Sequence, residues 1–149
     1  MTVYDYISLG DLDLEFISHS PAETEEFAFN LAKKISSPRV ICLTGDLGAG
    51  KTAFTRGFAR YFGIDKGVSS PTFIIMHRYV GSEVINHYDL YRISDFDELC
   101  DIGFEEQIES GISLIEWPDS FMEFLPENKI VVKITRLGEC ERLISMEDF

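Results

Sequence analysis

A glycine-rich segment, residues 45–52 with the sequence GDLGAGKT, restricts this chain to a small group of folds. It fits the phosphate-binding pattern G-x-x-x-x-G-K-[ST] at every fixed position. Glycines allow successive backbone N–H groups to turn inward and surround a phosphate chain. Lys51 can then reach the β- and γ-phosphates, and the Thr52 hydroxyl can ligate Mg²⁺. The pattern predicts a nucleotide-phosphate site.

The flanks of this segment have the arrangement that the pattern requires. Residues 39–44 form an apolar run rich in β-branched side chains, which predicts a buried strand. In residues 53–62, Phe54, Phe58 and Phe62 are four apart and would share one face of a helix. Strand, glycine-rich segment and helix therefore follow each other in the expected order.

The rest of the sequence predicts one α/β domain over residues 1–149. Strands are predicted at residues 12–18, 39–44, 72–80, 83–91, 112–115, 129–135 and 142–146, and helices at residues 21–35, 53–62, 95–101 and 104–110. Ser20, Pro21 and Glu23 form a capping-box pattern, residues 81–82 indicate a two-residue hairpin, and a second hairpin is expected around Gly138. The expected fold is a single P-loop NTPase domain, in which helices flank a sheet with a parallel core and antiparallel additions.

The net charge of −13 is distributed unevenly. Residues 33–92 carry nine basic and four acidic side chains, an excess that suits an anionic nucleotide. Residues 93–128 carry eleven acidic side chains and no Lys or Arg, so they would repel a nucleic-acid backbone. Tight RNA binding by this chain alone is therefore not expected. The acidic stretch is either a solvated face or a docking surface for a basic partner.

Neither a membrane segment nor a secretion signal is expected. The chain has no run of about 18 apolar residues, and its first residues lack a basic stretch followed by an apolar one. Its three cysteines, Cys42, Cys100 and Cys140, are widely spaced and lack the spacing of a zinc site, which favours reduced thiols. These features predict a cytoplasmic protein.

A phosphate-binding segment of this kind needs a carboxylate at the end of another buried strand, to hold Mg²⁺ and its waters. Glu116 closes the apolar run 112–115 and is the first candidate, although an exposed strand end would show the same pattern. Asp89 lies in the sequence HYDLYR, residues 87–92. It would orient the attacking water, support the metal ion or merely cap a strand.

Three further features are less specific. Residues 69–73 (SSPTF) follow the predicted helix, where loops that sense the γ-phosphate occur, but they also fit a turn that enters a strand. Trp117 either covers the nucleotide or is a half-buried aromatic side chain. His77 and His87 have no metal-ligand partners at suitable spacing and are expected to be structural.

Taken together, five sequence blocks resemble the bacterial TsaE (YjeE) family, small ATPases of tRNA threonylcarbamoyladenosine biosynthesis. The blocks are GDLGAGKT (45–52), RG (56–57), SPTF (70–73), HYDLYR (87–92) and IEWP (115–118). They occur in the order of the family and at similar spacing, through most of the chain. One such glycine-rich segment is compatible with many functions, whereas five ordered blocks are not.

The resemblance implies that the protein binds ATP with Mg²⁺ and hydrolyses it slowly to ADP. By position it implies that Lys51 binds phosphate, that Thr52 and Glu116 hold Mg²⁺, and that Asp89 lies near the phosphates. Lys51, Asp89 and Glu116 are then the expected catalytic residues. The nucleotide-contacting residues that it implies are Ser20, Asp46, Leu47, Gly48, Ala49, Gly50, Lys51, Thr52, Trp117 and Arg136.

The resemblance also implies two protein partners, TsaD and TsaB. These would transfer threonylcarbamoyl from threonylcarbamoyl-AMP to the adenosine beside the anticodon of certain tRNAs. The ATPase would permit repeated turnover and would contact tRNA only indirectly, through the complex.

Two other functions remain open on the sequence alone. A P-loop small-molecule kinase usually has lid arginines that neutralise the transferred phosphate, and residues 93–128 contain none. A non-hydrolytic assembly module would use nucleotide only to set its assembly state. A GTPase is disfavoured, because residues 128–131 (NKIV) end in valine where the guanine-reading motif has aspartate.

Overall fold

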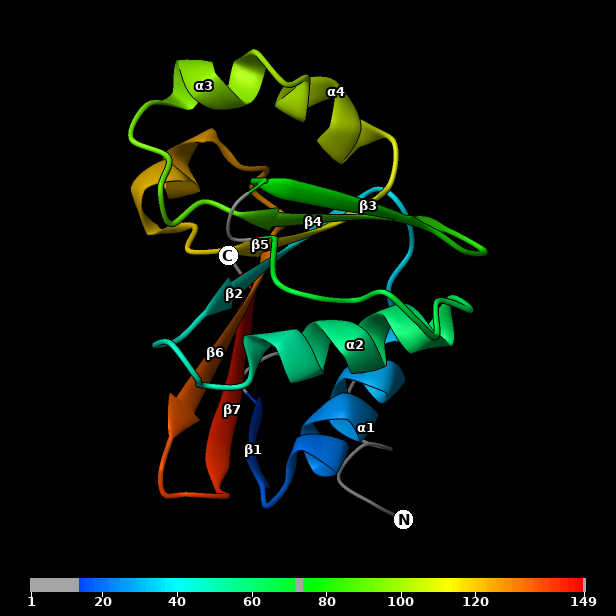
Figure 1. Ribbon diagram of the computed structural model, residues 1–149, viewed down its shortest axis with the longest axis vertical. Helices are drawn as coiled ribbons and strands as arrows, with labels where there is room; N and C mark the ends of the chain where they lie inside the picture. Colours follow the sequence, from blue (N-terminus) through cyan, green and yellow to red (C-terminus); the bar gives the residue numbers. More distant parts are fainter. Residues whose placement is uncertain (1–13, 72–73, 149) are drawn as a thin grey trace.

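In the computed structural model, which describes residues 14–71 and 74–148, a sheet in the order β1-β7-β6-β2-β5-β4-β3 forms the framework (Figure 1). Its strands are β1 (Leu14–Ser18), β2 (Arg39–Thr44), β3 (Met76–Val80), β4 (Val84–Asp89), β5 (Ile112–Glu116), β6 (Ile130–Arg136) and β7 (Arg142–Asp148). The helices are α1 (Pro21–Ala32), α2 (Lys51–Tyr61), α3 (Phe96–Cys100), α4 (Phe104–Glu109) and the 3₁₀-helix η2 (Asp119–Phe124).

Four adjacent strands in the middle of the sheet are parallel. β4 pairs with β5, β5 with β2, and β2 with β6 in this sense, whereas β3, β7 and β1 join antiparallel. The predicted parallel core with antiparallel additions is therefore confirmed. Parallel strands end at the same edge of a sheet. Glu116 is accordingly the register partner of both Leu43 in β2 and Asp89 in β4.

Helices cover both faces of the sheet, as Figure 1 shows for α1 and α2 on one face and α3 and α4 on the other. In β2, Ile41 and Leu43 point into the core beneath α1 and α2, whereas Val40 and Cys42 point into the core on the opposite face. This alternation follows from the period of two in a strand. The predicted apolar face of α2, formed by Phe54, Phe58 and Phe62, is buried in the first of these cores.

The strand predicted for residues 72–80 is wrong at its start, because β3 begins at Met76. Residues 72–73 lie outside the described residues. Ile74 and Ile75 form a turn, in which both amides donate to the Pro71 carbonyl at 3.2 and 2.9 Å and Ile75 has a φ of 68°. Their β-branched side chains favour a strand, but local hydrogen bonds of the backbone determine the turn.

Two other boundaries also differ. The hairpin predicted at residues 81–82 has three connecting residues, because Val80 is the register partner of Val84. The helix predicted to reach residue 35 ends at Ala32. The other strands and helices that the structure describes are confirmed, with ends within two residues of those predicted. The start of the strand predicted at residues 12–18 lies outside the described residues. The 3₁₀-helix η2 is not predicted by the sequence patterns.

Candidate functional site

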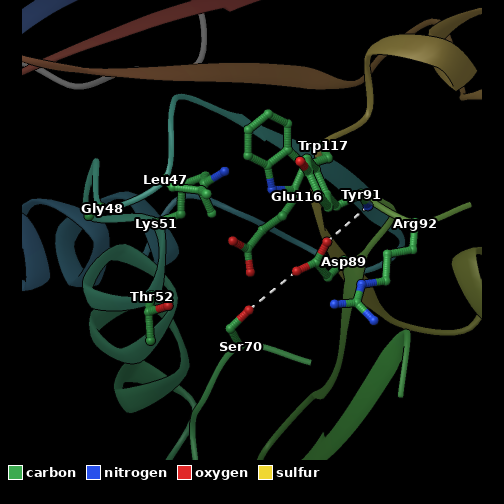
Figure 2. Close-up of a pocket in the computed structure, with 11 residues that line it drawn as sticks. Leu47, Gly48, Lys51, Thr52, Ser70, Asp89, Tyr91, Arg92, Glu116 and Trp117 are labelled. Carbon is green, nitrogen blue, oxygen red and sulfur yellow. Dashed lines mark hydrogen bonds between the residues drawn. The ribbon is translucent and has the colours of Figure 1, made fainter. Parts of the chain in front are cut away.

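The carboxyl ends of β4 and β5 and the amino end of α2 surround a pocket of about 510 Å³ (Figure 2). The residues that line it are Leu47, Gly48, Gly50, Lys51, Thr52, Ser70, Asp89, Tyr91, Arg92, Glu116 and Trp117. Because the parallel strands end here, side chains that are far apart in the sequence lie side by side. Most of the residues predicted for the site are among them.

The glycine-rich segment enters this pocket with backbone angles that other residues avoid. Gly48 has a φ of 78° and Gly50 a φ of 110°, and a Cβ atom added to either would meet no heavy atom within 4 Å. The open space lies beside the amino end of α2, which has no side-chain cap. Helix amino ends attract anions through their free N–H groups and the helix dipole. The segment therefore has the shape and polarity that a phosphate chain requires.

Lys51, the first residue of α2, is only 5% exposed. Its Nζ donates a hydrogen bond to the Gly45 carbonyl at 2.8 Å and lies 3.8 Å from the centre of the Trp117 ring. Burial lowers the pKa of the Lys51 ammonium, and the carboxylates of Glu116 and Asp89 oppose that shift because they favour the charged form. The site thus contains a largely desolvated cation, which an anionic ligand would stabilise.

Trp117 is half-buried, and its backbone has a φ of 58°, which is unusual for a residue with a side chain. Its ring contacts Lys51 and lies 5.0 Å from the ring of Tyr91, measured between centroids. Figure 2 shows the indole beside the pocket that Glu116 also lines. Trp117 therefore forms one wall of the pocket.

Two carboxylates project into the pocket from neighbouring strand ends (Figure 2). Asp89 is 6% exposed and accepts hydrogen bonds from the Ser70 hydroxyl at 3.3 Å and the Tyr91 amide at 3.0 Å. Glu116 is 3% exposed and faces the same pocket as the Thr52 hydroxyl. Carboxylate and hydroxyl oxygens are ligands that Mg²⁺ accepts.

Over residues 14–71 and 74–148, no group of three or more His, Cys, Asp or Glu side chains could hold a metal ion. Thr52 and Glu116 would therefore supply only part of a Mg²⁺ shell, and phosphate and water oxygens would supply the remainder. This is the usual arrangement for Mg²⁺ bound with a nucleotide. The donor set therefore fits the ion that the sequence predicts.

His87, which is expected to be structural, is a direct partner of Glu116. It is fully buried, and its Nε2 lies 2.6 Å from Glu116 Oε2. Because an ionised carboxylate can only accept, the proton lies on Nε2, and Nδ1 faces the Tyr79 hydroxyl at 3.5 Å. A spacing of two residues between His87 and Asp89 on one strand is the signal that could have indicated this contact, since both face the same side.

A second pocket, of about 550 Å³, adjoins the first across Trp117. The residues that line it are Thr44, Gly45, Asp46, Trp117, Asp119, Lys133, Ile134, Thr135 and Arg136. Of the predicted nucleotide contacts, Asp46 and Arg136 therefore belong to this pocket rather than to the first.

Ser20 and Ala49 do not line either of these two pockets in the described part of the chain. The Ser20 hydroxyl accepts a hydrogen bond from the Glu23 amide at 3.1 Å and caps α1, as its sequence pattern predicts. The side chain of Ala49 is buried in the core. Its backbone nevertheless belongs to the glycine-rich segment that borders the first pocket.

Arg142, the first residue of β7, also contacts the glycine-rich segment, which the sequence does not predict. Its Nε donates to the Ala49 carbonyl at 3.0 Å and its Nη2 to the Gly48 carbonyl at 3.3 Å. Its Nη1 donates to the carbonyls of Gly138 and Glu141, both at 3.0 Å, in the turn between β6 and β7. One guanidinium therefore connects that turn to the segment, and no local pattern around Arg142 marks this role.

Comparison with known proteins agrees with this arrangement. Residues 18–144 match the family model described as threonylcarbamoyl adenosine biosynthesis protein TsaE. The TsaE protein of Bacillus subtilis is 40% identical over 134 residues, which are 89% of this chain and 84% of that protein. The TsaE protein of Rickettsia conorii is 38% identical over 130 residues, 86% of this chain and 74% of that protein.

The fold is also similar to a solved structure. The crystal structure of YdiB from Bacillus subtilis superposes with a TM-score of 0.75 at 35% identity, covering 91% of this chain and 84% of that one. Fold and site together define a mixed α/β protein with a glycine-rich segment between a parallel strand and a helix. The chain belongs to the TsaE family of tRNA threonylcarbamoyladenosine biosynthesis. None of the helices in residues 14–71 and 74–148 combines the length and the hydrophobicity that a membrane span requires.

Proposed function

We propose that this protein is a Mg²⁺-dependent ATPase of tRNA threonylcarbamoyladenosine biosynthesis, acting in the cytoplasm. The observation that carries this proposal is the convergence of Lys51, Thr52, Asp89 and Glu116 on one pocket at the amino end of α2. Each of these groups has a role in phosphoryl transfer to water, where catalysis consists of positioning and charge stabilisation. Family membership supports the biological role.

The residues of the pocket would have separate roles in binding and hydrolysis. Lys51 and the backbone N–H groups of the glycine-rich segment bind the phosphates. Thr52 and Glu116 hold Mg²⁺, which neutralises negative charge on the phosphates when it is bound. Asp89 orients the attacking water or supports the metal ion, a role consistent with a carboxylate fixed by Ser70 and the Tyr91 amide. The burial of these groups strengthens every electrostatic interaction among them.

The second pocket is the place for the nucleoside part of ATP. It adjoins the first pocket, which we call the phosphate pocket, across Trp117. Its lining includes an aromatic ring for stacking and both charged and hydroxyl side chains for hydrogen bonds. Asp46, Asp119 and Arg136 are the side chains that would recognise the base and ribose. A nucleotide extended across Trp117 would occupy both pockets.

TsaD and TsaB are the proposed partners, and tRNA is reached only through them. The family assignment supports this part of the proposal, together with the charge of the surface. Acidic side chains of α3 and α4, among them Asp97, Glu105 and Glu106, are exposed. An exposed acidic surface disfavours direct binding of a nucleic-acid backbone.

Nucleotide binding tests the proposal independently of turnover. Trp117 is the single tryptophan of the chain and lines both pockets, so its fluorescence should change on addition of ATP or ADP with Mg²⁺. GTP should produce a weaker change at the same concentration, because no aspartate follows the Asn128-Lys129 pair at the guanine-reading position. Fluorescence that does not respond to ATP or ADP, together with no binding by calorimetry, would contradict the proposal.

A further inference from the structure

The two carboxylates of the site are both connected by hydrogen bonds to one short segment of the chain, Ser69 and Ser70. The connection to Asp89 is direct, since the Ser70 hydroxyl donates to Asp89 Oδ2 at 3.3 Å. The connection to Glu116 has three steps, from the Ser69 amide through Tyr79 in β3 and His87 in β4. The adjacent residues Ser69 and Ser70 therefore lie at the origin of both connections.

The longer connection starts at the Tyr79 hydroxyl. It accepts a hydrogen bond from the Ser69 amide at 3.3 Å, and its single proton reaches Nδ1 of His87 at 3.5 Å when it is not donated to the Ser69 carbonyl at 3.2 Å or to Nδ1 of His77 at 3.0 Å. His87 then donates from Nε2 to Glu116 Oε2 at 2.6 Å. Tyr79 is half-buried, His87 is fully buried and Glu116 is 3% exposed, so the connection passes from a strand at the sheet edge into the interior.

We infer that His87 and Tyr79 are positioning residues that fix the Glu116 carboxylate for Mg²⁺ and connect it to the Ser69–Ser70 segment. This inference rests on the proposed Mg²⁺–nucleotide site. His87 occupies Oε2 of Glu116, which orients Oε1 as the oxygen available for coordination. Carboxylates that ligate a metal ion are themselves held by hydrogen bonds, and loss of such a partner typically lowers metal affinity about 10–100-fold.

The arrangement separates His87 from the residues that bind phosphate. His87 does not line the phosphate pocket as described, whereas Lys51 and Thr52 do. Loss of the imidazole should therefore weaken the contribution of Mg²⁺ to nucleotide binding and leave the Mg²⁺-independent part unchanged. A residue that only stabilises the fold would weaken both parts together.

The experiment is a titration of ADP followed by Trp117 fluorescence, first in EDTA and then at increasing Mg²⁺ concentration. The variants are His87→Gln, whose amide N–H can replace Nε2, His87→Leu, which removes the donor, and Tyr79→Phe, which removes only the bridging hydroxyl. Tyr61→Phe, at the far end of α2, is the matched control for the tyrosine change. ADP avoids any dependence on hydrolysis.

We expect His87→Leu to bind ADP in EDTA as the wild type does, but to need at least about 10-fold more Mg²⁺ for the tighter complex. His87→Gln should recover part of this loss, Tyr79→Phe should show a smaller shift in the same direction, and Tyr61→Phe none. Wild-type Mg²⁺ dependence in His87→Leu, or equal weakening with and without Mg²⁺, would overturn the inference.

If His87→Leu does not fold, Tyr79→Phe is the variant that tests the inference, since it retains the aromatic ring and removes only the hydroxyl. Wild-type Mg²⁺ dependence in Tyr79→Phe would overturn the connection to Ser69. A wild-type protein that does not bind ADP at all would instead contradict the proposed function, so the two failures are distinguishable.

Discussion

Arg142 donates a hydrogen bond to the Ala49 carbonyl at 3.0 Å, across a separation of 93 residues in the sequence. This contact, together with the one to Gly48, holds two carbonyls of the glycine-rich segment toward the β6–β7 turn. Arg142 itself is not among the described residues that line the first pocket. The geometry of the segment therefore depends on a residue outside it.

Replacement of Arg142 by alanine should weaken ADP binding about 10-fold, because hydrogen bonds from a charged donor contribute about 1.5–3 kcal/mol each and part of this is recovered by solvent. Arg142→Lys should retain part of the affinity, since one ammonium cannot contact as many carbonyls as a guanidinium. Calorimetric titration measures the effect, with Arg60→Ala on the exposed end of α2 as control. Unchanged affinity in Arg142→Ala would show that the segment keeps its shape without this contact.

Glu116→Gln and Asp89→Asn keep the shape of each side chain and remove its charge. Each should lower ATP hydrolysis about 10²-fold or more, the usual effect of removing one group that stabilises or orients the transition state. ADP binding in EDTA should persist, because Lys51 and the glycine-rich segment remain. The two assays are run on the same preparations.

The same variants separate an ATPase from an assembly module. If Glu116→Gln binds ATP, does not hydrolyse it and still supports repeated tRNA modification with TsaD and TsaB, nucleotide would act only through assembly. If hydrolysis is required for turnover, modification in the presence of this variant stops after the first round.

Gly57 marks the closest approach between α2 and α1. A Cβ atom at this position would lie 2.0 Å from the Glu25 carbonyl oxygen, which is far inside van der Waals contact. Gly57→Ala should therefore destabilise the fold by about 3 kcal/mol, near the upper end for overpacking, although alanine gains about 1 kcal/mol in helix propensity. Urea unfolding measures the change. Gly138→Ala is the control, since its Cβ would meet no atom within 4 Å, and equal stability of the two variants would contradict the packing.

The buried thiol of Cys42 gives stability a dependence on alkaline pH. Burial raises the pKa of Cys42 from 9.0 to about 12. Between these values the unfolded chain loses the thiol proton while the folded chain keeps it, so stability falls as pH rises. Cys42→Ala should lose stability less steeply than the wild type over this interval.

Burial also raises the pKa of Tyr88, but that contribution is present in both proteins and cancels in the comparison. Unfolding free energies measured in urea below and above pH 9 test the prediction. Equal slopes for the wild type and Cys42→Ala would show that the thiol is not buried as described.

The sequence predicts the central part of the fold because its signals there are local. Local patterns in residues 39–62 predict a strand, a glycine-rich segment and a helix in that order, and the apolar run that precedes Glu116 identifies its strand end. The turn at Ile74 and Ile75 is not predicted correctly. The hydrogen bonds from both amides to the Pro71 carbonyl outweigh the strand preference of the two β-branched side chains.

The contacts that the sequence does not predict are those that depend on register. His87 meets Glu116 because β4 and β5 are neighbours in parallel, and Arg142 meets Ala49 because β7 and the β6–β7 turn approach the glycine-rich segment. The spacing of His87 and Asp89 indicates only that these two side chains share a face, and no local pattern marks Arg142, because the partners are separated by 29 and 93 residues. The identity of both side chains is visible in the sequence, but their partners are not.

Steady-state ATP hydrolysis by the purified protein, alone and with TsaD and TsaB, tests the proposed ATPase site and the proposed partnership in one measurement. Lys51→Ala serves as the blank, and Lys33→Ala, at an exposed position, is the matched control. We expect slow hydrolysis alone, faster hydrolysis with the partners, and a loss of about 10²–10³-fold in Lys51→Ala only. Hydrolysis that persists in Lys51→Ala would contradict the site, and hydrolysis that is indifferent to TsaD and TsaB would contradict the proposed partnership.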